Sequence, residues 1–170
     1  MIAVRFSKVA MVAAIGLFAA LVAFGNITDY GSNLVFVQHV LAMDTVFPQS
    51  TIRYRAITSP ALQHAAYALI IAIEVATAVL CAAGAVALAR QLRSRAAAFG
   101  RAKKWAVIGL ATGFLLWQVG FMSIGGEWFG MWQSQQWNGV PSAFRFAVVI
   151  GLVLLFVAMR DEELEPDGLK

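Results

Sequence analysis

The sequence is poor in cysteine, histidine and charge. Its 170 residues include one cysteine, Cys81, and two histidines, His39 and His64. A single cysteine excludes a disulfide framework and a metal site built from several thiolates. Charged residues make up 13% of the chain, whereas an average soluble domain has about 25%. The composition therefore excludes a disordered chain and an ordinary water-soluble enzyme domain.

Familiar enzyme motifs are absent as well. The sequence has no phosphate-binding glycine loop with a lysine, no His-Glu-x-x-His and no Gly-x-Ser-x-Gly. It also has no inverted repeat of the kind found in secondary transporters. We therefore expect no catalytic residue and no metal site in this chain.

Apolar residues, in contrast, are abundant and form 61% of the chain. A helix needs roughly 20 mostly apolar residues to cross about 30 Å of hydrocarbon. Four segments approach this requirement: residues 9–24, 65–89, 105–124 and 142–159. The sequence thus predicts an all-α fold, an integral membrane four-helix bundle over residues 1–160, with an acidic tail at residues 161–170.

Residues 9–24 also fit a second interpretation. Charged residues precede this apolar run, and small residues lie near its end, at Ala23 and Gly25. This order resembles a cleaved secretory signal peptide. The run is slightly longer than the apolar part of a signal peptide, which has about 7–15 residues. We favour an uncleaved helix on this ground, and cleavage stays the alternative.

Positive charge gathers on one side of the predicted spans. With the N-terminus inside, ten of the thirteen Lys and Arg residues lie inside, and Arg53, Arg55 and Arg145 lie outside. Because cytoplasmic segments are enriched in Lys and Arg, we expect both termini in the cytoplasm. Since these cations flank spans, the expected partner is the lipid bilayer, with no nucleic acid. The acidic tail either contacts the basic connection 91–104 or is simply solvated.

Two outer loops are expected to pack together as a cap. The first contains the apolar residues 33–44, which are too few to span and predict a short interfacial helix, with a strand over 33–37 as the alternative. The second contains Trp128 and Trp132, four residues apart and hence on one face of a helix. We expect these tryptophans at the headgroup level; the alternative is an aromatic wall over a ligand cavity.

Glu74 is the only charged residue within residues 65–89. A carboxylate in hydrocarbon costs several kcal/mol unless it is paired, protonated or next to a polar cavity. Gln118 in the third span lies at nearly the same depth, so the hypothesis is a protonated Glu74 that hydrogen-bonds Gln118. Tyr67 lies on the same helix face as Glu74. This candidate polar site either fixes helix register or handles a proton or a quinone headgroup.

A second candidate site lies at the outer face. Two imidazoles at one membrane depth are able to hold a haem iron, although each histidine is more simply an interfacial hydrogen-bonding group. Arg145 either extends outward to water or pairs with Glu127. We expect no cofactor, and the alternative is haem b or a quinone. The residues of this site are His39, His64, Asp44, Glu127, Arg145, Trp128 and Trp132.

Small residues recur along one face of the third span. Gly109 and Gly113 form a small-xxx-small pattern, which allows close approach of helix backbones in lipid. The pattern predicts helix packing, and the partner helix belongs either to this chain or to another copy or protein.

Two segments carry a resemblance to a known family. They are residues 33–45 (Asn-Leu-Val-Phe-Val-Gln-His-Val-Leu-Ala-Met-Asp-Thr) and 126–133 (Gly-Glu-Trp-Phe-Gly-Met-Trp-Gln). With the four spans they resemble a bacterial family of predicted small integral membrane proteins classed as a domain of unknown function. The resemblance implies an inner-membrane location and transfers no catalytic residue.

As function we expect a non-enzymatic accessory or scaffolding subunit that associates with a membrane protein or with its own copies. The alternatives are a redox anchor that binds quinone or haem, and a small component of a transporter or channel.

Overall fold

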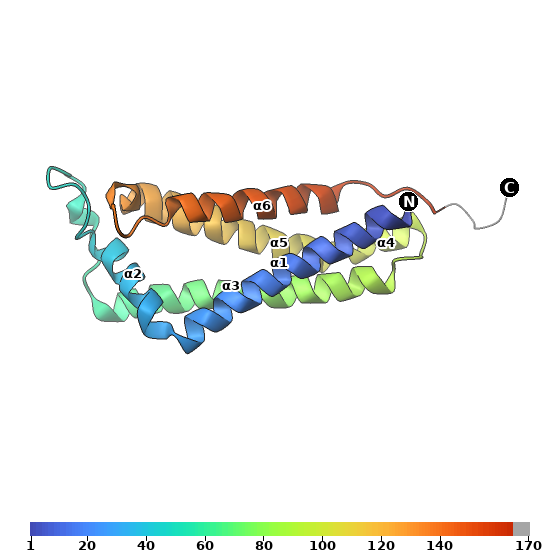
Figure 1. The fold of residues 1–170 in the computed structure, drawn as a ribbon, viewed down its shortest axis with the longest axis horizontal. Coiled ribbons are helices and arrows are strands. Elements are labelled where there is room, and N and C mark those ends of the chain that lie inside the picture. The colour runs from blue at the N-terminus through green and yellow to red at the C-terminus, as the bar shows by residue number, and fades with distance from the viewer. Residues whose placement is uncertain (165–170) are drawn as a thin grey trace.

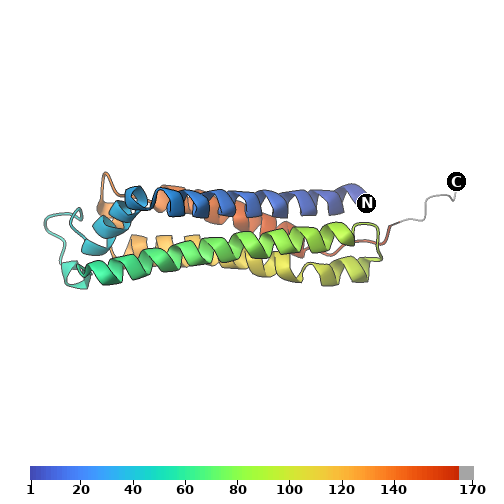
Figure 2. The ribbon, with the colours of Figure 1, turned by 90° about the horizontal axis from the view of Figure 1, so that it is seen from below.

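The fold is a bundle of four long helices with a cap at one end. A computed structural model describes residues 1–164 of the chain. The long helices are α1 (Ile2–Thr28), α3 (Pro60–Arg90), α5 (Lys104–Leu115) continued by η2 (Leu116–Trp128), and α6 (Val140–Ala158). Each is long and apolar enough to cross a membrane. The predicted all-α fold with four spans is therefore confirmed (Figures 1 and 2).

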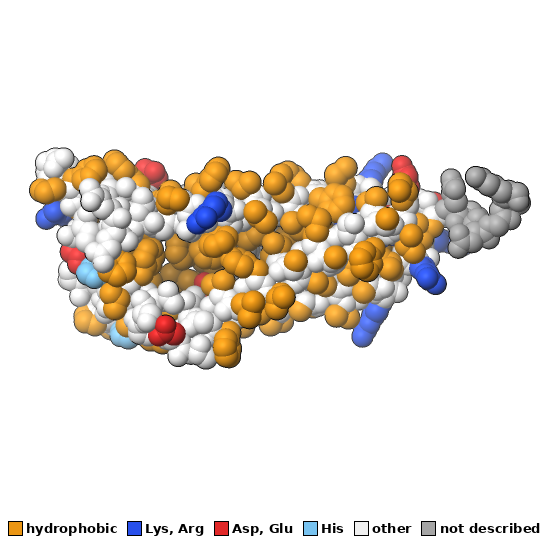
Figure 3. Space-filling view, in the orientation of Figure 1, with side chains coloured by type: hydrophobic (Ala, Val, Ile, Leu, Met, Phe, Trp, Pro, Cys, Tyr) orange, Lys and Arg blue, Asp and Glu red, His pale blue; other side chains and the backbone are white. Residues whose placement is uncertain are grey.

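The two ends of the bundle differ. The N-terminus and the end of α6 lie at one end, here called the terminal end (Figure 1). The opposite end, here called the cap end, carries α2 (Tyr30–Ala42), η1 (Arg53–Arg55) and η3 (Met131–Gln133). At the terminal end, α4 (Ala96–Ala102) lies in the connection between α3 and α5. Most charged side chains lie toward the two ends, and hydrophobic side chains cover most of the surface between them (Figure 3).

The helices extend beyond the apolar segments read from the sequence. At 1.5 Å per residue the 31 residues of α3 measure roughly 46 Å, which exceeds the ~30 Å of hydrocarbon in a bilayer. Pro60 begins α3 at a position where its missing N–H costs nothing. α3 is therefore longer than the hydrocarbon is thick, so at least one of its ends projects beyond it.

Small residues let α3 pack closely against its neighbours. An added Cβ on Gly84 would lie 2.3 Å from the backbone nitrogen of Ala106 in α5. An added Cβ on Gly16 of α1 would lie 3.1 Å from the Cβ of Cys81. Cys81, Leu110 and Val12 are fully buried at these contacts. Close backbone approach replaces the hydrophobic effect as the source of packing energy between helices in lipid.

The continuation of α5 is a π-helix. Residues Leu116–Trp128 form i→i+5 hydrogen bonds over 13 residues. Most π-helices are single-turn bulges inside α-helices, often at functional sites. Because a π-helix turns less per residue than an α-helix, side chains after Leu116 point in directions that an α-helical projection does not predict.

The cap is built from both loops, as predicted. Phe47 N donates a hydrogen bond to Gln133 Oε1 at 3.1 Å, and the His39 and Trp137 rings stack with centroids 4.5 Å apart. The first loop is helical from Tyr30 onward, so the alternative of a strand over residues 33–37 is wrong. Turning sharply at Asp29, the chain enters α2 directly from α1, and this places the apolar side of α2 over the bundle.

Candidate functional site

An apolar cavity lies beneath the cap. Its volume is about 590 Å³, within the range of about 300–1,000 Å³ that is usual for ligand sites. α2 covers it on the cap side, and α3 and the π-helical segment form its walls. The space-filling view is hollowed near this end of the bundle (Figure 3). Lining side chains include Phe36, Val40, Ala66, Ile70, Phe121 and Met131.

The lining offers almost nothing to a polar ligand. Of the described residues around the cavity, only Thr112 has a polar side chain, and its hydroxyl donates to Ile108 O at 2.9 Å. A quinone ring or a headgroup would therefore bury its oxygens without donors, which costs free energy. The lining fits a saturated or isoprenoid hydrocarbon chain.

The mouth of the cavity opens toward the surrounding lipid. Leu69 on α3 and Leu115 at the end of α5 line the cavity, yet 61% and 54% of their surfaces are exposed. Val119 and Ile124 of the π-helix line it in the same way. A chain from a neighbouring lipid is thus able to enter from the side, between α3 and η2.

Glu74, the charged residue within the second span, bonds a different residue from the one predicted. Glu74 is 3% exposed, and its Oε2 accepts a 2.8 Å hydrogen bond from Asn26 Nδ2 of α1. Tyr67 OH donates to the backbone oxygen of Asn26 at 3.2 Å. Gln118 uses its backbone oxygen to accept from Ser123 Oγ at 3.0 Å. The predicted pairing of Glu74 with Gln118 is therefore wrong: the side-chain hydrogen bond that the Glu74 carboxyl accepts comes from Asn26 of α1.

Aromatic contacts extend this polar site toward the cap. The Tyr30 and Tyr67 rings lie 4.7 Å apart, and Tyr30 OH lies 2.8 Å from His64 Nδ1. His64 is exposed near the start of α3. Asn26, Glu74, Tyr67, Tyr30 and His64 thus form one connected set of contacts between α1, α2 and α3.

The two histidines, for which haem ligation was the alternative to hydrogen bonding, have separate partners. His39 Nδ1 lies 2.8 Å from Asp44 Oδ2 and its ring stacks on Trp137, whereas His64 contacts Tyr30. Within residues 1–164, no three His, Cys, Asp or Glu side chains gather closely enough to hold a metal ion. No contact brings the two imidazoles together as an axial pair.

The remaining outer-face candidates also occupy separate places. Arg145 donates to Ser142 Oγ at 2.9 Å on its own helix, and Glu127 is exposed without forming an ion pair in the described part of the chain. Trp128 accepts a 3.1 Å hydrogen bond at its backbone oxygen from Arg55, whose guanidinium lies over the Trp128 ring. Trp132 stacks edge-on with Phe47. About half of each tryptophan is exposed, at 53% and 49%.

The small residues of the third span face α3 of the same chain. An added Cβ on Gly109 would lie 2.8 Å from Cys81 N, and one on Gly113 would lie 2.9 Å from Thr77 Cγ2. This face is consequently occupied inside the monomer.

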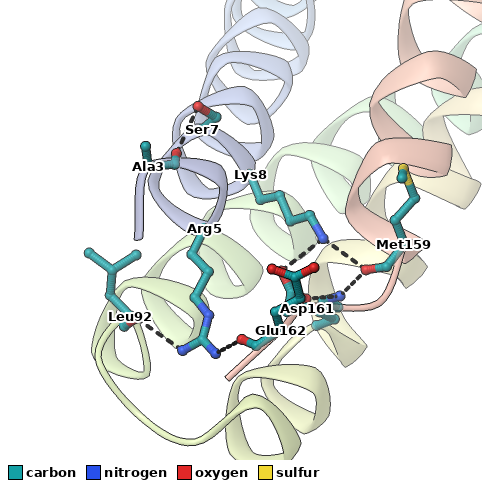
Figure 4. A network of polar contacts seen from close by, with 9 residues as sticks. Ala3, Arg5, Ser7, Lys8, Leu92, Met159, Asp161 and Glu162 are labelled. Atoms are coloured by element: carbon teal, nitrogen blue, oxygen red, sulfur yellow. Dashed lines mark hydrogen bonds and ion pairs between the residues drawn. The ribbon is translucent and has the colours of Figure 1, made fainter. Parts of the chain in front are cut away.

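A buried ionic cluster at the terminal end was missed by the sequence reasoning. Arg5 and Lys8 of α1 are each 1% exposed. Lys8 Nζ bonds Asp161 Oδ1 at 2.9 Å, and Lys103 pairs with the other oxygen of Asp161 (Figure 4). Burial by itself would raise the pKa of the Asp161 carboxyl, but bonds from Lys103 and Lys8 outweigh it and hold the pKa below its ordinary value. The spacing of Arg5 and Lys8, three apart on one helix face, was the available signal.

The first residues after α6 thus contact the basic connection, one of the two outcomes considered for the tail. Glu163 Oε2 also accepts a 3.0 Å hydrogen bond from Ala96 N. The rest of the predicted tail, residues 165–170, lies outside the described residues.

Comparison with known proteins agrees with the membrane fold. No curated protein and no solved structure matches the chain. A family model described as "predicted small integral membrane protein (DUF2165)" matches residues 4–160. The match includes all four spans, both cap loops and the end of the α6 segment that leads to Asp161. The chain is a member of the DUF2165 family of predicted small integral membrane proteins.

Proposed function

We propose that this protein is a non-enzymatic accessory protein of the bacterial inner membrane that holds the hydrocarbon chain of a lipid or isoprenoid quinone beneath its cap. The cavity of about 590 Å³ carries the proposal. A large apolar cavity in a folded protein binds an apolar guest rather than water. Its mouth faces the medium in which such chains are dissolved.

The polar headgroup of this ligand stays outside the cavity. The lining provides no free donor, since the Thr112 hydroxyl is already bonded to Ile108. The π-helical wall supports a binding role, because irregular helix geometry is retained mainly where function requires it. A quinone would accordingly be held by its tail, and Glu74 with Asn26 would stabilise the helices next to it.

The accessory role depends on the cap. Trp128 and Trp132 expose about half of their surfaces, and aromatic side chains are enriched both at headgroups and at protein interfaces. In the proposed orientation both termini are cytoplasmic, because ten of the thirteen Lys and Arg residues lie on that side. The cap then faces the periplasm, where a partner subunit or a second copy would contact it.

Native mass spectrometry of the protein released from membranes in mild detergent tests the binding. We expect one tightly held molecule per chain that survives removal of loosely bound lipid. Its mass distinguishes a phospholipid from an isoprenoid quinone. Occupancy no greater than that of the surrounding lipids would contradict the proposal.

Two substitutions on α3 provide a matched pair. Ala66→Phe fills the cavity, because Ala66 lines it. Ala68→Phe adds the same ring at an exposed position of the same helix. We expect at least about a fivefold loss of the bound molecule in the first variant, which corresponds to about 1 kcal/mol or more, and unchanged occupancy in the second. Equal occupancy in both variants would show that the molecule binds elsewhere.

A further inference from the structure

The ionic cluster at the terminal end carries more positive than negative charge. Arg5 and Lys8 are 1% exposed and Lys103 is 8% exposed. Lys8 and Lys103 pair with the buried carboxylate of Asp161, and Arg5 bonds the backbone oxygen of the next residue, Glu162. Buried charges are costly unless each is paired. Among residues 1–164, Asp161 supplies the only carboxylate that is paired with any of these cations.

Backbone oxygens supply the other contacts of the cations. Lys8 Nζ and Lys103 Nζ both donate to Met159 O, at 2.8 and 2.7 Å. Arg5 donates to Leu92 O at 3.3 Å and to Glu162 O at 2.8 Å (Figure 4). Arg5 Nε is buried without a hydrogen-bond partner among residues 1–164. Dipoles of this kind reduce the desolvation cost but do not neutralise a charge.

The anion that holds this cluster together comes from outside the bundle. Arg5 and Lys8 belong to α1, and Lys103 belongs to the junction of α4 and α5. Asp161 lies three residues beyond the end of α6, in a segment without regular structure. The Asp161 carboxylate therefore lies between the helices on a segment without regular structure, as a bound ligand would.

We propose that Arg5, Lys8 and Lys103 form a binding site for a phosphate group, and that the Asp161 carboxylate occupies this site as an internal ligand. The phosphate of a lipid headgroup carries one negative charge, as a carboxylate does, but offers more acceptor oxygens, which suits three cationic donors and the unpartnered Arg5 Nε–H. The natural source is the headgroup of an anionic phospholipid in the leaflet at the terminal end, because the first turns of α1 lie where that leaflet begins. This site is separate from the cavity, which lies at the other end of the bundle.

Chemical rescue of an Asp161 variant tests the site. Asp161→Asn removes the internal anion with little change in shape. Glu163→Gln removes the same charge two residues away, where the carboxylate bonds Ala96 N and none of the three cations. Each protein is placed in phosphatidylcholine nanodiscs with or without phosphatidylglycerol, and thermal unfolding is followed by tryptophan fluorescence. A third arm adds inorganic phosphate to the phosphatidylcholine discs.

We expect D161N to unfold at a lower temperature than the wild type in phosphatidylcholine, and phosphatidylglycerol to restore at least half of this loss. Phosphatidylglycerol should raise the unfolding temperatures of the wild type and E163Q much less. Rescue by inorganic phosphate alone would assign the site to a soluble phosphate instead of a lipid. An equal rise in the unfolding temperatures of all three proteins would indicate general attraction to the leaflet and would overturn the proposal. The absence of any rescue of D161N would also overturn it.

A second measurement uses the wild-type cluster, in case D161N does not fold. Leu164→Cys introduces a labelling position next to the segment, and the only native cysteine, Cys81, is fully buried. A nitroxide at position 164 should become more mobile in phosphatidylglycerol than in phosphatidylcholine, because the lipid phosphate displaces Asp161. Identical spectra in the two lipids would overturn the proposal.

Discussion

Asn26 of α1 donates a 2.8 Å hydrogen bond to the carboxyl group of Glu74 on α3. The bond joins the end of the first span to the interior of the second, where Glu74 is almost completely buried. The backbone oxygen of Asn26 also accepts a hydrogen bond from the Tyr67 hydroxyl. One residue of α1 thus satisfies two polar side chains of α3.

The first prediction concerns the coupling between these two residues. We expect a double-mutant cycle with Asn26→Ala and Glu74→Leu, each of which removes the hydrogen bond, to give a coupling energy of about 0.6 kcal/mol and at most about 1.7 kcal/mol, the mean and the maximum found for hydrogen bonds between membrane helices. The measurement is reversible unfolding in mixed micelles. A parallel cycle with Gln118→Ala and Glu74→Leu should give a coupling near zero. A larger coupling to Gln118 would contradict the contact with Asn26.

The second prediction concerns close helix packing. Gly84→Ala should destabilise the protein by about 1–3 kcal/mol or more, because the added methyl group overlaps the backbone of Ala106. Gly25→Ala is the matched control, since an added Cβ there meets no atom within 4 Å. The control should be neutral or slightly stabilising, because alanine is the better helix former. Comparable losses of thermal stability in both variants would argue against this packing.

The third prediction concerns pH. The pKa of Asp161 is held below its ordinary value of about 3.9 by Lys103 and Lys8. A group whose pKa is lowered by folding contributes stability above its unfolded pKa and loses it as the pH falls through the folded value. The difference in melting temperature between the wild type and D161N should therefore be constant from pH 7 to about 5 and shrink below about 4. A difference that grows on acidification would have the wrong sign.

The fourth prediction concerns orientation. Thr51→Cys lies exposed in the cap, whereas Leu164→Cys lies at the terminal end. A thiol reagent that does not cross membranes should label position 51 in cells with a permeabilised outer membrane, and position 164 only after the inner membrane is disrupted. Native Cys81 gives no background because it is buried. The reverse pattern would invert the proposed topology.

The fifth prediction is that the first span stays attached to the mature protein. Arg5 and Lys8 bind the segment after α6, and Asn26 binds Glu74, so α1 has specific contacts at both ends. Intact mass of the purified protein should match the chain with residues 1–25. Loss of about 25 residues would support the signal-peptide alternative, and the stability of the remaining three helices would then need another source.

Some expectations depended only on position along a helix, and these agreed with the structure. Tyr67 and Glu74 recur at helical spacing on one face of the second span, and both are buried. Depth alone did not identify the partner of Glu74. Matching depth places Gln118 opposite, but whether two side chains meet also depends on how each helix is rotated, and the π-helix after Leu116 changes that rotation.

The sequence by itself determined the medium, the number of spans and the side on which positive charge gathers. These properties follow from the length and composition of local segments, because every backbone polar group in hydrocarbon must be satisfied within its own helix. Tertiary structure alone decided the partner of Glu74, the cavity beneath α2 and the insertion of Asp161 among Arg5, Lys8 and Lys103. These features join residues as far apart as 153 positions, and they arise from the rotation and close approach of helices, which no local pattern encodes.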